Sequence, residues 1–443
     1  MIPRSLLYFT ILSGMVTLLN SFGAAASPRR CFCTSDALCR RIVSQPHETE
    51  VVVVTEGKSL YKNWMWESIK TVISHNYTDP ELMCYAHSQG AKFGFIAKVP
   101  GVKSKDDASL ADFIKDTKVH LVDTYADVLV LDLLDLVDCT TQADSIGNLT
   151  DIVLKVVMEA KPTTSSLTKV MCIVPWKPPC FNNDCGFLIN ISKDNRGCDF
   201  FISNPESYTF ECHSTCKARA TVPFQKLAIG TDEYLTFIKN QQLLVGIPWH
   251  AYDYTCKEMN DNNCMLSKRD NSSDCDYEGS RKKIGLSDWR HTHPNYDGSW
   301  DNHQKAMYFN YNNTSDATKH QVWYEGFESL HEKYQFVKQL ELKGVVIWTG
   351  DDLTYANLNF DMKVSDNVWS WLLHTILATG EVEKHSGFDL AGNMAGVGVG
   401  CFLFGTAMGV AIAALLFRKK FMGKRRRPFQ KDVDEYHDED QQL

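Results

Sequence analysis

The sequence lacks several features that would assign it to a functional class at once. Its 443 residues carry a net charge of -8, so there is no positive excess of the kind that nucleic-acid binding uses. The fourteen histidines do not cluster at metal-ligand spacings, and no pattern indicates a cofactor. We therefore expect no metal site and no nucleic-acid partner. With 44% hydrophobic and 23% charged residues, the composition is that of a globular protein.

Long apolar runs are few, and two of them stand out. Residues 1–26 contain Arg4, an apolar run and a small-residue end, a pattern typical of a cleaved signal peptide. An uncleaved anchor is the alternative, but the run is shorter than the ~20 residues that span a bilayer. The second run, 390–417, is long enough to span, and the basic cluster after it predicts a cytosolic side.

These runs predict a single-pass type I membrane protein whose main domain is luminal or extracellular. The expected parts are a signal peptide (1–26), a large domain (27–380), a polar stalk (381–389), a transmembrane helix (390–417) and a cytosolic tail (418–443). Gly392, Gly396 and Gly400 recur every four residues in the span, which would let two helices approach closely in a homodimer. A glycine-containing single span is the alternative.

Cysteines and glycosylation sequons agree with this topology. Fourteen of the fifteen cysteines lie between Cys31 and Cys275, and we expect most or all of them to form disulfides. The six sequons all precede the span; they are at Asn76, Asn148, Asn190, Asn271, Asn312 and Asn313. A lysosomal or endosomal membrane, or the cell surface, fits both signals.

Strand-like and helix-like segments alternate along the large domain. The candidate strands are Glu50–Thr55, Ile69–Ser74, Lys92–Ala97, Tyr125–Asp138, Lys169–Val174, Asp199–Ser203, Leu243–Pro248 and Gly344–Trp348. Helical patterns fall at Asp79–Gly90, from Ser109 onward, and at Asp144–Ala160, Asp232–Asn240 and Glu328–Glu341. Eight such β/α units predict a (β/α)8 barrel, with a polar insertion at Lys257–His303 over its mouth.

The stretch from Tyr125 to Asp138, YADVLVLDLLDLVD, is almost wholly aliphatic but contains Asp127 and Asp132. Together with Glu81–Lys92, Leu243–Cys256, His320–Gly326 and Lys343–Trp348, it resembles glycoside hydrolase family 18 over most of the large domain. In that family the fourth strand carries Asp-Gly-x-x-x-Asp-x-Glu, and the glutamate donates the catalytic proton. The resemblance implies a barrel that recognises N-acetylglucosamine (GlcNAc) glycans.

The motif is incomplete in this chain. Asp127 and Asp132 match the first two acids, as motif remnants, but Leu134 stands at the proton-donor position. Asp135 is on the opposite face if the strand continues, and becomes available only if the strand has ended. Cys198–Cys212 also lacks the Met-x-Tyr-Asp pattern of the family's sixth strand. The resemblance therefore predicts that hydrolysis has been lost.

Aromatic residues suited to a sugar site are retained. By the resemblance, Trp348 matches the tryptophan that lies beneath the reacting sugar in family 18. The further candidate glycan contacts are Trp249, Tyr252, Asp253 and Trp176. Alternatively, Trp348 and Trp249 only fill the top of the barrel. Asp132 is either a relic held by a polar neighbour or part of a remaining binding site.

Three functions follow. The favoured one is a non-catalytic barrel that binds GlcNAc-containing glycans. The second is an active lysosomal glycosidase that cleaves GlcNAc–GlcNAc by a substrate-assisted retaining mechanism, using Asp132 and a displaced acid such as Asp135. The third is a structural or partner-binding ectodomain without affinity for sugar.

Overall fold

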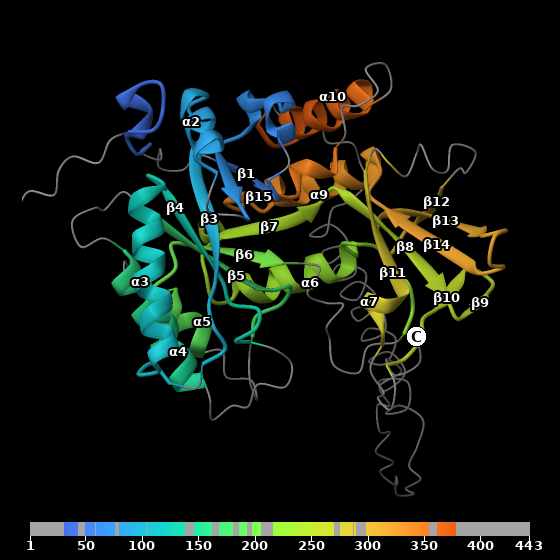
Figure 1. Ribbon diagram of the computed structural model, residues 1–443. Helices are drawn as coiled ribbons and strands as arrows, with labels where there is room; N and C mark the ends of the chain where they lie inside the picture. The colour runs from blue at the N-terminus through green and yellow to red at the C-terminus, as the bar shows by residue number, and fades with distance from the viewer. Residues whose placement is uncertain are drawn as a thin grey trace, which may run out of the picture. The chain divides into compact units, whose positions relative to one another are not determined.

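The computed structural model contains a closed barrel of eight parallel strands and, beside it, an antiparallel sheet of five strands (Figure 1). The residues that it describes are 31–42, 49–57, 59–75, 79–102, 104–137, 146–161, 168–179, 186–192, 197–204, 216–269, 275–286, 288, 298–353 and 361–377. The signal peptide, stalk, transmembrane helix and tail predicted above lie outside this part of the chain. Among the described residues, no helix is both long and apolar enough to span a membrane.

Seven barrel strands follow the predicted segments closely, whereas the strand predicted at Tyr125–Asp138 covers only Val128–Asp132, because the chain turns directly after Asp132. The barrel strands are β1 (Glu50–Thr55), β2 (Thr71–Ser74), β3 (Lys92–Lys98), β4 (Val128–Asp132), β5 (Lys169–Pro175), β6 (Phe200–Asn204), β7 (Leu243–Pro248) and β15 (Gly344–Trp348). Neighbours pair in parallel around the ring in the order β1-β15-β7-β6-β5-β4-β3-β2. The (β/α)8 prediction is therefore confirmed for the barrel.

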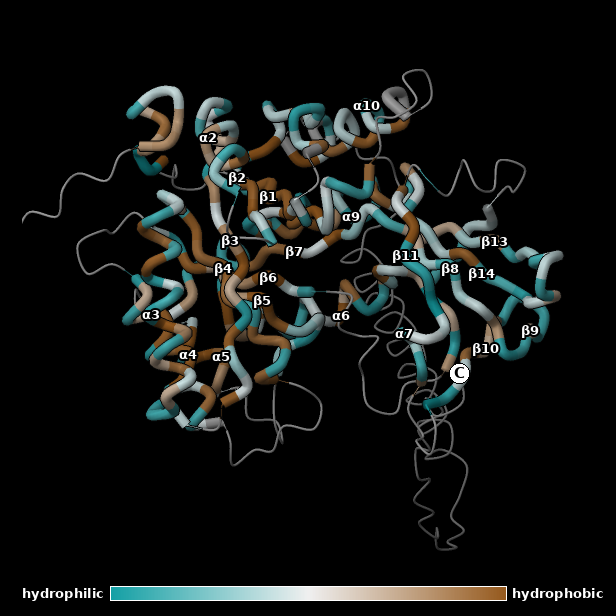
Figure 2. Tube along the Cα trace, viewed as in Figure 1, coloured by the Kyte–Doolittle hydropathy of each residue, from teal (hydrophilic) through white to brown (hydrophobic). Residues whose placement is uncertain are grey.

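Each barrel strand is buried on both faces, which explains its continuous apolar sequence. In β4, Val128 and Val130 belong to the cluster inside the barrel, whereas Leu129 and Leu131 join the layer between the strands and the helices. Figure 2 shows the barrel strands as mainly hydrophobic. Because side chains alternate along a strand, Asp132 continues the inward-facing series.

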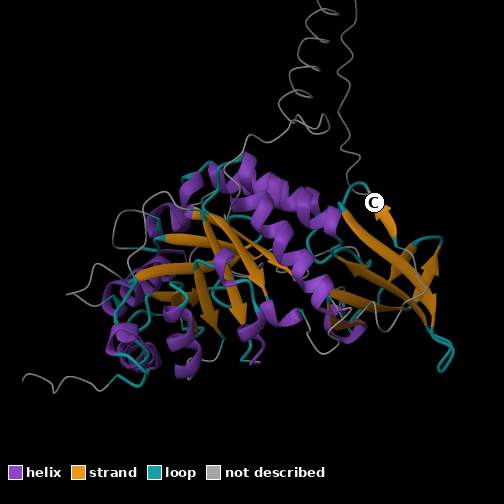
Figure 3. Ribbon diagram, turned by 90° about the horizontal axis from the view of Figure 1, so that it is seen from above, coloured by secondary structure: helices purple, strands orange, loops and turns teal. Residues whose placement is uncertain are grey.

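Helices wrap the outside of the barrel, as the view from above shows (Figure 3). They are α2 (Pro80–Ser88), α3 (Ala108–Asp123), α4 (Ile146–Ala160), α5 (Gly186–Ile191), α6 (Phe224–Leu235), α9 (Phe327–Gln339) and α10 (Asp361–Leu372), the last followed by a π-helical turn, η9 (Leu373–Leu377). Short 3-10 turns occur at η1 (Asp36–Cys39), η2 (Ser59–Asn63), η3 (Trp66–Ser68), η7 (Asn240–Gln242) and η8 (Gly350–Asp352).

Two helix predictions need correction, and two helices were missed. The cap of α3 is Asp107, whose side chain accepts from the Ser109 N–H, rather than Ser109 itself. The helix predicted at Asp232–Asn240 starts eight residues earlier, at Phe224, because Pro223 directly precedes it and Phe224 and Leu227 supply its buried face. Helices α5 and α10 were not predicted.

The insertion between β7 and β15 is larger than Lys257–His303. Its main sheet has the order β11-β8-β14-β13-β12 and begins at His250, directly after β7. The strands are β8 (His250–Cys256), β11 (Arg281–Gly285), β12 (Ser299–Asp301), β13 (Ala306–Asn312) and β14 (Lys319–Tyr324), with a hairpin of β9 (Glu258–Asn260) and β10 (Asn263–Met265) and a short α7 (Tyr277–Ser280). The segments with alternating aromatic and polar residues around Tyr252 and His320 therefore belong to this sheet, not to the barrel.

A buried ion pair joins the insertion to the outer helices. Glu325, at the end of β14, accepts a hydrogen bond from the ammonium group of Lys333 in α9, and both side chains are 0% exposed. The Glu325 carboxylate also accepts from the hydroxyls of Ser329 and Thr221. Burial lowers the pKa of Lys333, and the charge of Glu325 opposes this effect. The buried charges of Glu325 and Lys333 thus have their hydrogen-bond partners only when the whole network, including Ser329 and Thr221, is present.

We expect Lys333→Met to lower the free energy of unfolding by about 3–5 kcal/mol, because it leaves the Glu325 carboxylate buried without a counter-charge. Urea unfolding of the secreted ectodomain measures this change. The double variant Lys333→Met/Glu325→Gln should regain much of the loss. A single variant as stable as the natural protein would contradict this account.

Candidate functional site

The carboxyl ends of parallel strands meet at one edge of a barrel, and four side chains of chemical interest lie there. Trp348 and Asp132 are the last residues of β15 and β4, Lys98 ends β3, and His75 directly follows β2. In the strand order β15-β1-β2-β3-β4, His75 is two strands from Trp348, and Lys98 and Asp132 follow on the next two strands. Sequence positions that are 273 residues apart, 75 and 348, are thereby brought together: the rings of His75 and Trp348 lie 6.5 Å apart and nearly perpendicular.

Asp132 is partly buried at this edge. Its Oδ1 accepts a hydrogen bond from the Leu134 backbone N–H at 3.0 Å. Burial raises the pKa of Asp132, while this hydrogen bond and the nearby Lys98 ammonium oppose the rise. The carboxyl group is therefore held by its own chain, and burial favours its protonated form.

Leu134 lies just beyond β4, in the turn that begins after Asp132. Its partly buried side chain packs against the apolar cluster inside the barrel, as does Trp348. Asp135 is exposed, and its Oδ2 pairs with the Lys98 ammonium at 2.8 Å. Because the strand ends at Asp132, alternation no longer determines where Asp135 points.

The predicted glycan contacts differ in their surroundings. Trp348 is partly exposed, but Trp249 is 0% exposed; its Nε1 donates to the Tyr334 hydroxyl at 2.8 Å, and its ring packs on Trp369 at 4.8 Å. Trp249 thus fills the core, which was the alternative to a binding role. Burial of this kind leaves no surface for a sugar.

Tyr252, Asp253 and Trp176 are also buried. Tyr252 belongs to the insertion core, with the Arg281 guanidinium 4.1 Å from the centre of its ring. Asp253 accepts from the Tyr311 hydroxyl at 2.6 Å and bonds His320 Nδ1 at 2.9 Å. Trp176 is 6% exposed. Tyr252 and Asp253 belong to strand β8 of the insertion, which directly follows β7, and their role as glycan contacts stays a prediction.

Asp127 does not face the inside of the barrel. Its Oδ2 accepts from the Phe93 N–H and bonds His87 Nε2, at 2.9 and 2.8 Å, and its Oδ1 accepts from the Ile42 N–H at 2.7 Å. His87 Nδ1 lies 2.6 Å from the Leu38 carbonyl oxygen, so both ring nitrogens are placed as donors. The Asp127 carboxylate therefore ties the N-terminal segment, α2, β3 and β4 together, in agreement with a structural role.

With this geometry established, comparisons with known proteins place the chain. Residues 203–352, from β6 to η8, match the family "Glycosyl hydrolases family 18". The chain is 28% identical to human (Homo sapiens) di-N-acetylchitobiase over 367 residues, which are 78% of this chain and 89% of the relative. The mouse (Mus musculus) di-N-acetylchitobiase is 29% identical over 374 residues, 80% of this chain and 96% of the relative. The predicted resemblance to glycoside hydrolase family 18 is confirmed.

Solved structures agree on the fold. A chitinase from Chromobacterium violaceum superimposes with a TM-score of 0.55 at 13% identity, covering 75% of this chain and 100% of that one. A plant class V chitinase mutant from Cycas revoluta, in complex with (GlcNAc)3, gives a TM-score of 0.52 at 14% identity and covers 72% and 99%. At such identities the likeness concerns the barrel alone.

Several residues at the strand ends of this barrel were not predicted. Lys98 and His75 could have been found as the polar residues at or just after two strand ends. Asp351 and Asp352 sit in η8, where Thr55 Oγ1 and the Glu56 N–H donate to Asp351 Oδ2. These bonds fix the turn after β15 to the end of β1 and so position Trp348.

The described sequons are accessible. Asn148, Asn190 and Asn312 are exposed and Asn313 is partly exposed, while Asn76 and Asn271 lie outside the described residues. Five disulfides are formed within the described part: Cys31–Cys39, Cys33–Cys84, Cys172–Cys198, Cys216–Cys275 and Cys256–Cys264. Disulfides in this number are typical of proteins that fold in oxidising compartments.

We expect the contact between His87 and Asp127 to make the domain more stable in acid than at neutral pH. Burial is the largest effect and disfavours the charged imidazole, but the hydrogen bond and the charge of Asp127, together with the bond to the Leu38 carbonyl, outweigh it and raise the pKa of His87 above 6.5. The stabilisation is complete below pH 6.5 and is lost as the pH rises through the folded-state pKa. Thermal melting from pH 5 to 8 should fall with this step in the natural protein but not in His87→Gln. Parallel pH profiles would contradict it.

Proposed function

We propose that this chain is a membrane-anchored family 18 barrel that binds GlcNAc-containing glycans without hydrolysing them. The observation that carries the proposal is the group at the proton-donor position. Leu134 packs into the barrel interior, and the acid beside it, Asp132, is bonded to the Leu134 backbone. Leucine has no proton to give to a leaving oxygen.

The magnitude of this loss supports the proposal. General acid catalysis contributes about 10²- to 10⁴-fold in rate, equivalent to roughly 3–5 kcal/mol of barrier. Asp135 does not replace the donor readily, because its exposed carboxylate is engaged by Lys98. The hydrogen bond to Asp135 raises the pKa of Lys98, so that ammonium group stays charged and is a poor acid at neutral pH.

Binding is proposed at the strand ends around Trp348. Trp348 keeps an exposed part beside His75, and Asp132 offers a polar group on the same edge. A partly exposed indole with a few polar groups is suited to the face of a sugar ring. The chitinase relative that was solved with (GlcNAc)3 suggests the ligand class.

Hydrolysis remains the second function that a specific observation favours. Burial raises the pKa of Asp132, which is the direction that an acid catalyst needs. An active enzyme would use Asp132 and a displaced acid on a chitobiose-type substrate. A structural ectodomain without sugar affinity is the third, favoured by the burial of Trp249, Tyr252 and Trp176.

We also propose the type I topology for this chain. A signal peptide at 1–26, a barrel domain at 27–380, a stalk at 381–389, a span at 390–417 and a tail at 418–443 would display the glycan site in the lumen of a lysosomal or endosomal compartment or at the cell surface. Gly392, Gly396 and Gly400 are the proposed contact of a homodimer within the span. The exposed sequons and the disulfides support a luminal or extracellular barrel.

The secreted ectodomain, residues 27–387, should not hydrolyse a fluorogenic chitobioside at pH 4.5 or 7, and glycan arrays should detect GlcNAc-oligomer binding. Trp348→Ala should weaken that binding about ten- to hundredfold, since losing a buried aromatic face costs roughly 1.5–3 kcal/mol. The Asp132→Ala and Leu134→Glu variants are assayed beside the natural sequence in the same two measurements.

Each outcome separates the three functions. Turnover by the natural sequence that disappears in Asp132→Ala would establish the enzyme instead. Absence of both turnover and glycan binding would leave the structural function. Trp371→Ala, a change at a tryptophan that is 40% exposed on α10, is the matched control and should leave glycan binding unchanged.

The full-length protein should resist extraction by alkaline carbonate, and truncation after residue 387 should release it into the medium. Peptide N-glycosidase should reduce the mass of both forms, because the exposed sequons are luminal in this topology. A full-length chain that carbonate extracts completely would refute the anchor but not glycan binding.

A further inference from the structure

Two disulfides lie side by side where the N-terminal segment meets α2. Cys31 is bonded to Cys39, and Cys33 to Cys84. The Sγ atom of Cys39 is 3.7 Å from that of Cys33, although the two are not bonded to each other. The sulfurs of Cys31, Cys33 and Cys39 all lie within 4.8 Å of one another. A sulfur of the Cys31–Cys39 disulfide, that of Cys39, is thus in contact with the Cys33–Cys84 disulfide.

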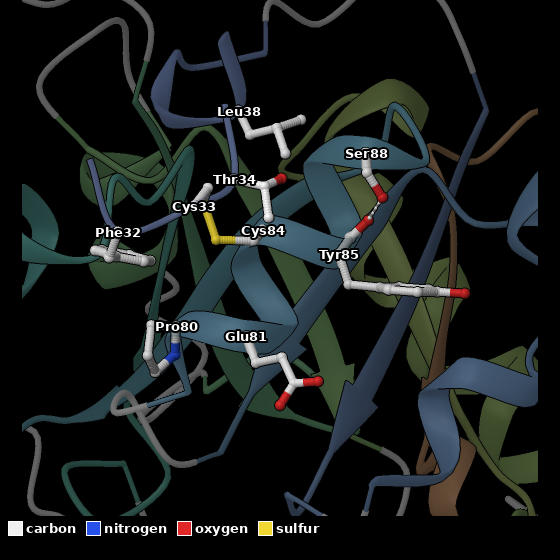
Figure 4. Close-up of a pocket in the computed structure, with 9 residues that line it drawn as sticks. All are labelled: Phe32, Cys33, Thr34, Leu38, Pro80, Glu81, Cys84, Tyr85 and Ser88. Carbon is white, nitrogen blue, oxygen red and sulfur yellow. Dashed lines mark hydrogen bonds between the residues drawn. A yellow bond between two sulfur atoms is a disulfide. The ribbon is translucent and has the colours of Figure 1, made fainter. Parts of the chain in front are cut away.

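These sulfurs can be approached from outside. All four cysteines are partly exposed, in contrast to Cys264, which is 1% exposed in the insertion. Figure 4 shows the Cys33–Cys84 bond in the wall of a groove of about 430 Å³, which Phe32, Pro80 and Tyr85 also line. The groove is lined by residues of the N-terminal segment and of α2, and Trp348 is not among them. A small thiol can therefore reach the pair through this groove.

We propose that these four cysteines form a thiol–disulfide exchange site that relays an attack by an external thiol from Cys31 to Cys84. Exchange requires a thiolate beside a disulfide sulfur, and Cys39 is already in that position. An external thiol, deprotonated by solvent, attacks Cys31 Sγ, and the Cys31–Cys39 bond breaks to release the Cys39 thiolate. Cys39 then attacks Cys33 Sγ, and the Cys33–Cys84 bond breaks.

The sequence of steps balances without a net oxidant or reductant. Two disulfides and one thiol enter; a mixed disulfide on Cys31, a Cys33–Cys39 bond and a Cys84 thiol leave, and Cys84 takes a proton from solvent. The covalent link from the N-terminal segment to α2 is lost in the exchange. That segment is then held by non-covalent bonds, including His87 to the Leu38 carbonyl and the Ile42 N–H to Asp127. The free Cys84 thiol is left at the groove wall.

The test uses the full-length protein in detergent with glutathione as the thiol. After acid quenching, free thiols are trapped with N-ethylmaleimide under denaturing conditions and the peptides are mapped by mass spectrometry. We expect glutathione on Cys31, a Cys33–Cys39 bond and alkylated Cys84. Alkylated Cys39 with an intact Cys33–Cys84 bond would overturn the proposal, and so would a cluster that glutathione leaves unchanged.

Substitution of Cys31 leaves a free Cys39 thiol, so the second exchange step can be tested without an external thiol. In Cys31→Ser, Cys39 is free from the outset, and we expect alkylation to be shared between Cys39 and Cys84. In Cys31→Ser/Cys39→Ser, the Cys84 label should disappear although the same loop is opened. Label on Cys39 alone in the single variant would show that the two disulfides are simple staples.

Cys256→Ser is the matched control, because Cys256–Cys264 closes a loop of the same sequence separation, 8 residues. Within the described chain, the close three-sulfur group occurs at Cys31, Cys33 and Cys39 and not there. Label should therefore stay on Cys264. Secretion and the thermal melting curve of each variant confirm that it folds. Migration of the label away from Cys264 would show that exchange in this protein does not depend on the sulfur cluster.

Discussion

The buried carboxylate of Asp127 is the interaction on which much of the barrel depends. It accepts from the backbone of β3 and of the N-terminal segment and from His87 of α2. A buried carboxylate is stable only when such partners satisfy it. Asp127 therefore fixes the start of β4, and through that strand the position of Asp132 at the other end. The motif acid Asp127 therefore has a structural role, because its carboxylate links the N-terminal segment, α2, β3 and β4.

Four polar or aromatic side chains lie at the carboxyl ends of the barrel strands. Parallel pairing brings His75, Lys98, Asp132 and Trp348 to one edge whatever their identities, because every strand runs in the same direction. Leu134 covers part of this edge from the inside, and Asp132 is bonded to its own turn. The barrel therefore decides which positions share this edge, independently of the residue type at any one of them.

The insertion depends on a different kind of contact. Its five-stranded sheet has its own aromatic core and joins the helices through Glu325 and Lys333, which are fully buried. Such a pair adds little net stability over an apolar contact but penalises any arrangement that separates it. The N-terminal segment is joined by sulfur chemistry instead, with two disulfides in contact. The insertion is thus joined to α9 by a buried ion pair, and the N-terminal segment is joined to α2 by the Cys33–Cys84 disulfide, for which we propose exchange.

The sequence by itself determined the eight strands, since continuous aliphatic runs bounded by helical patterns have few other stable arrangements than a parallel barrel. It also indicated the resemblance to glycoside hydrolase family 18 and the leucine at position 134, because motif positions are read directly from residue order. Only the tertiary structure decided which aromatic residues are accessible. Trp249 and Tyr252 follow a barrel strand as Trp176 does, and yet all three are buried: Trp249 packs on Trp369 of α10, Tyr252 lies in the core of the insertion, and Trp176 lies against α6. Burial depends on such distant contacts, and local pattern does not encode them.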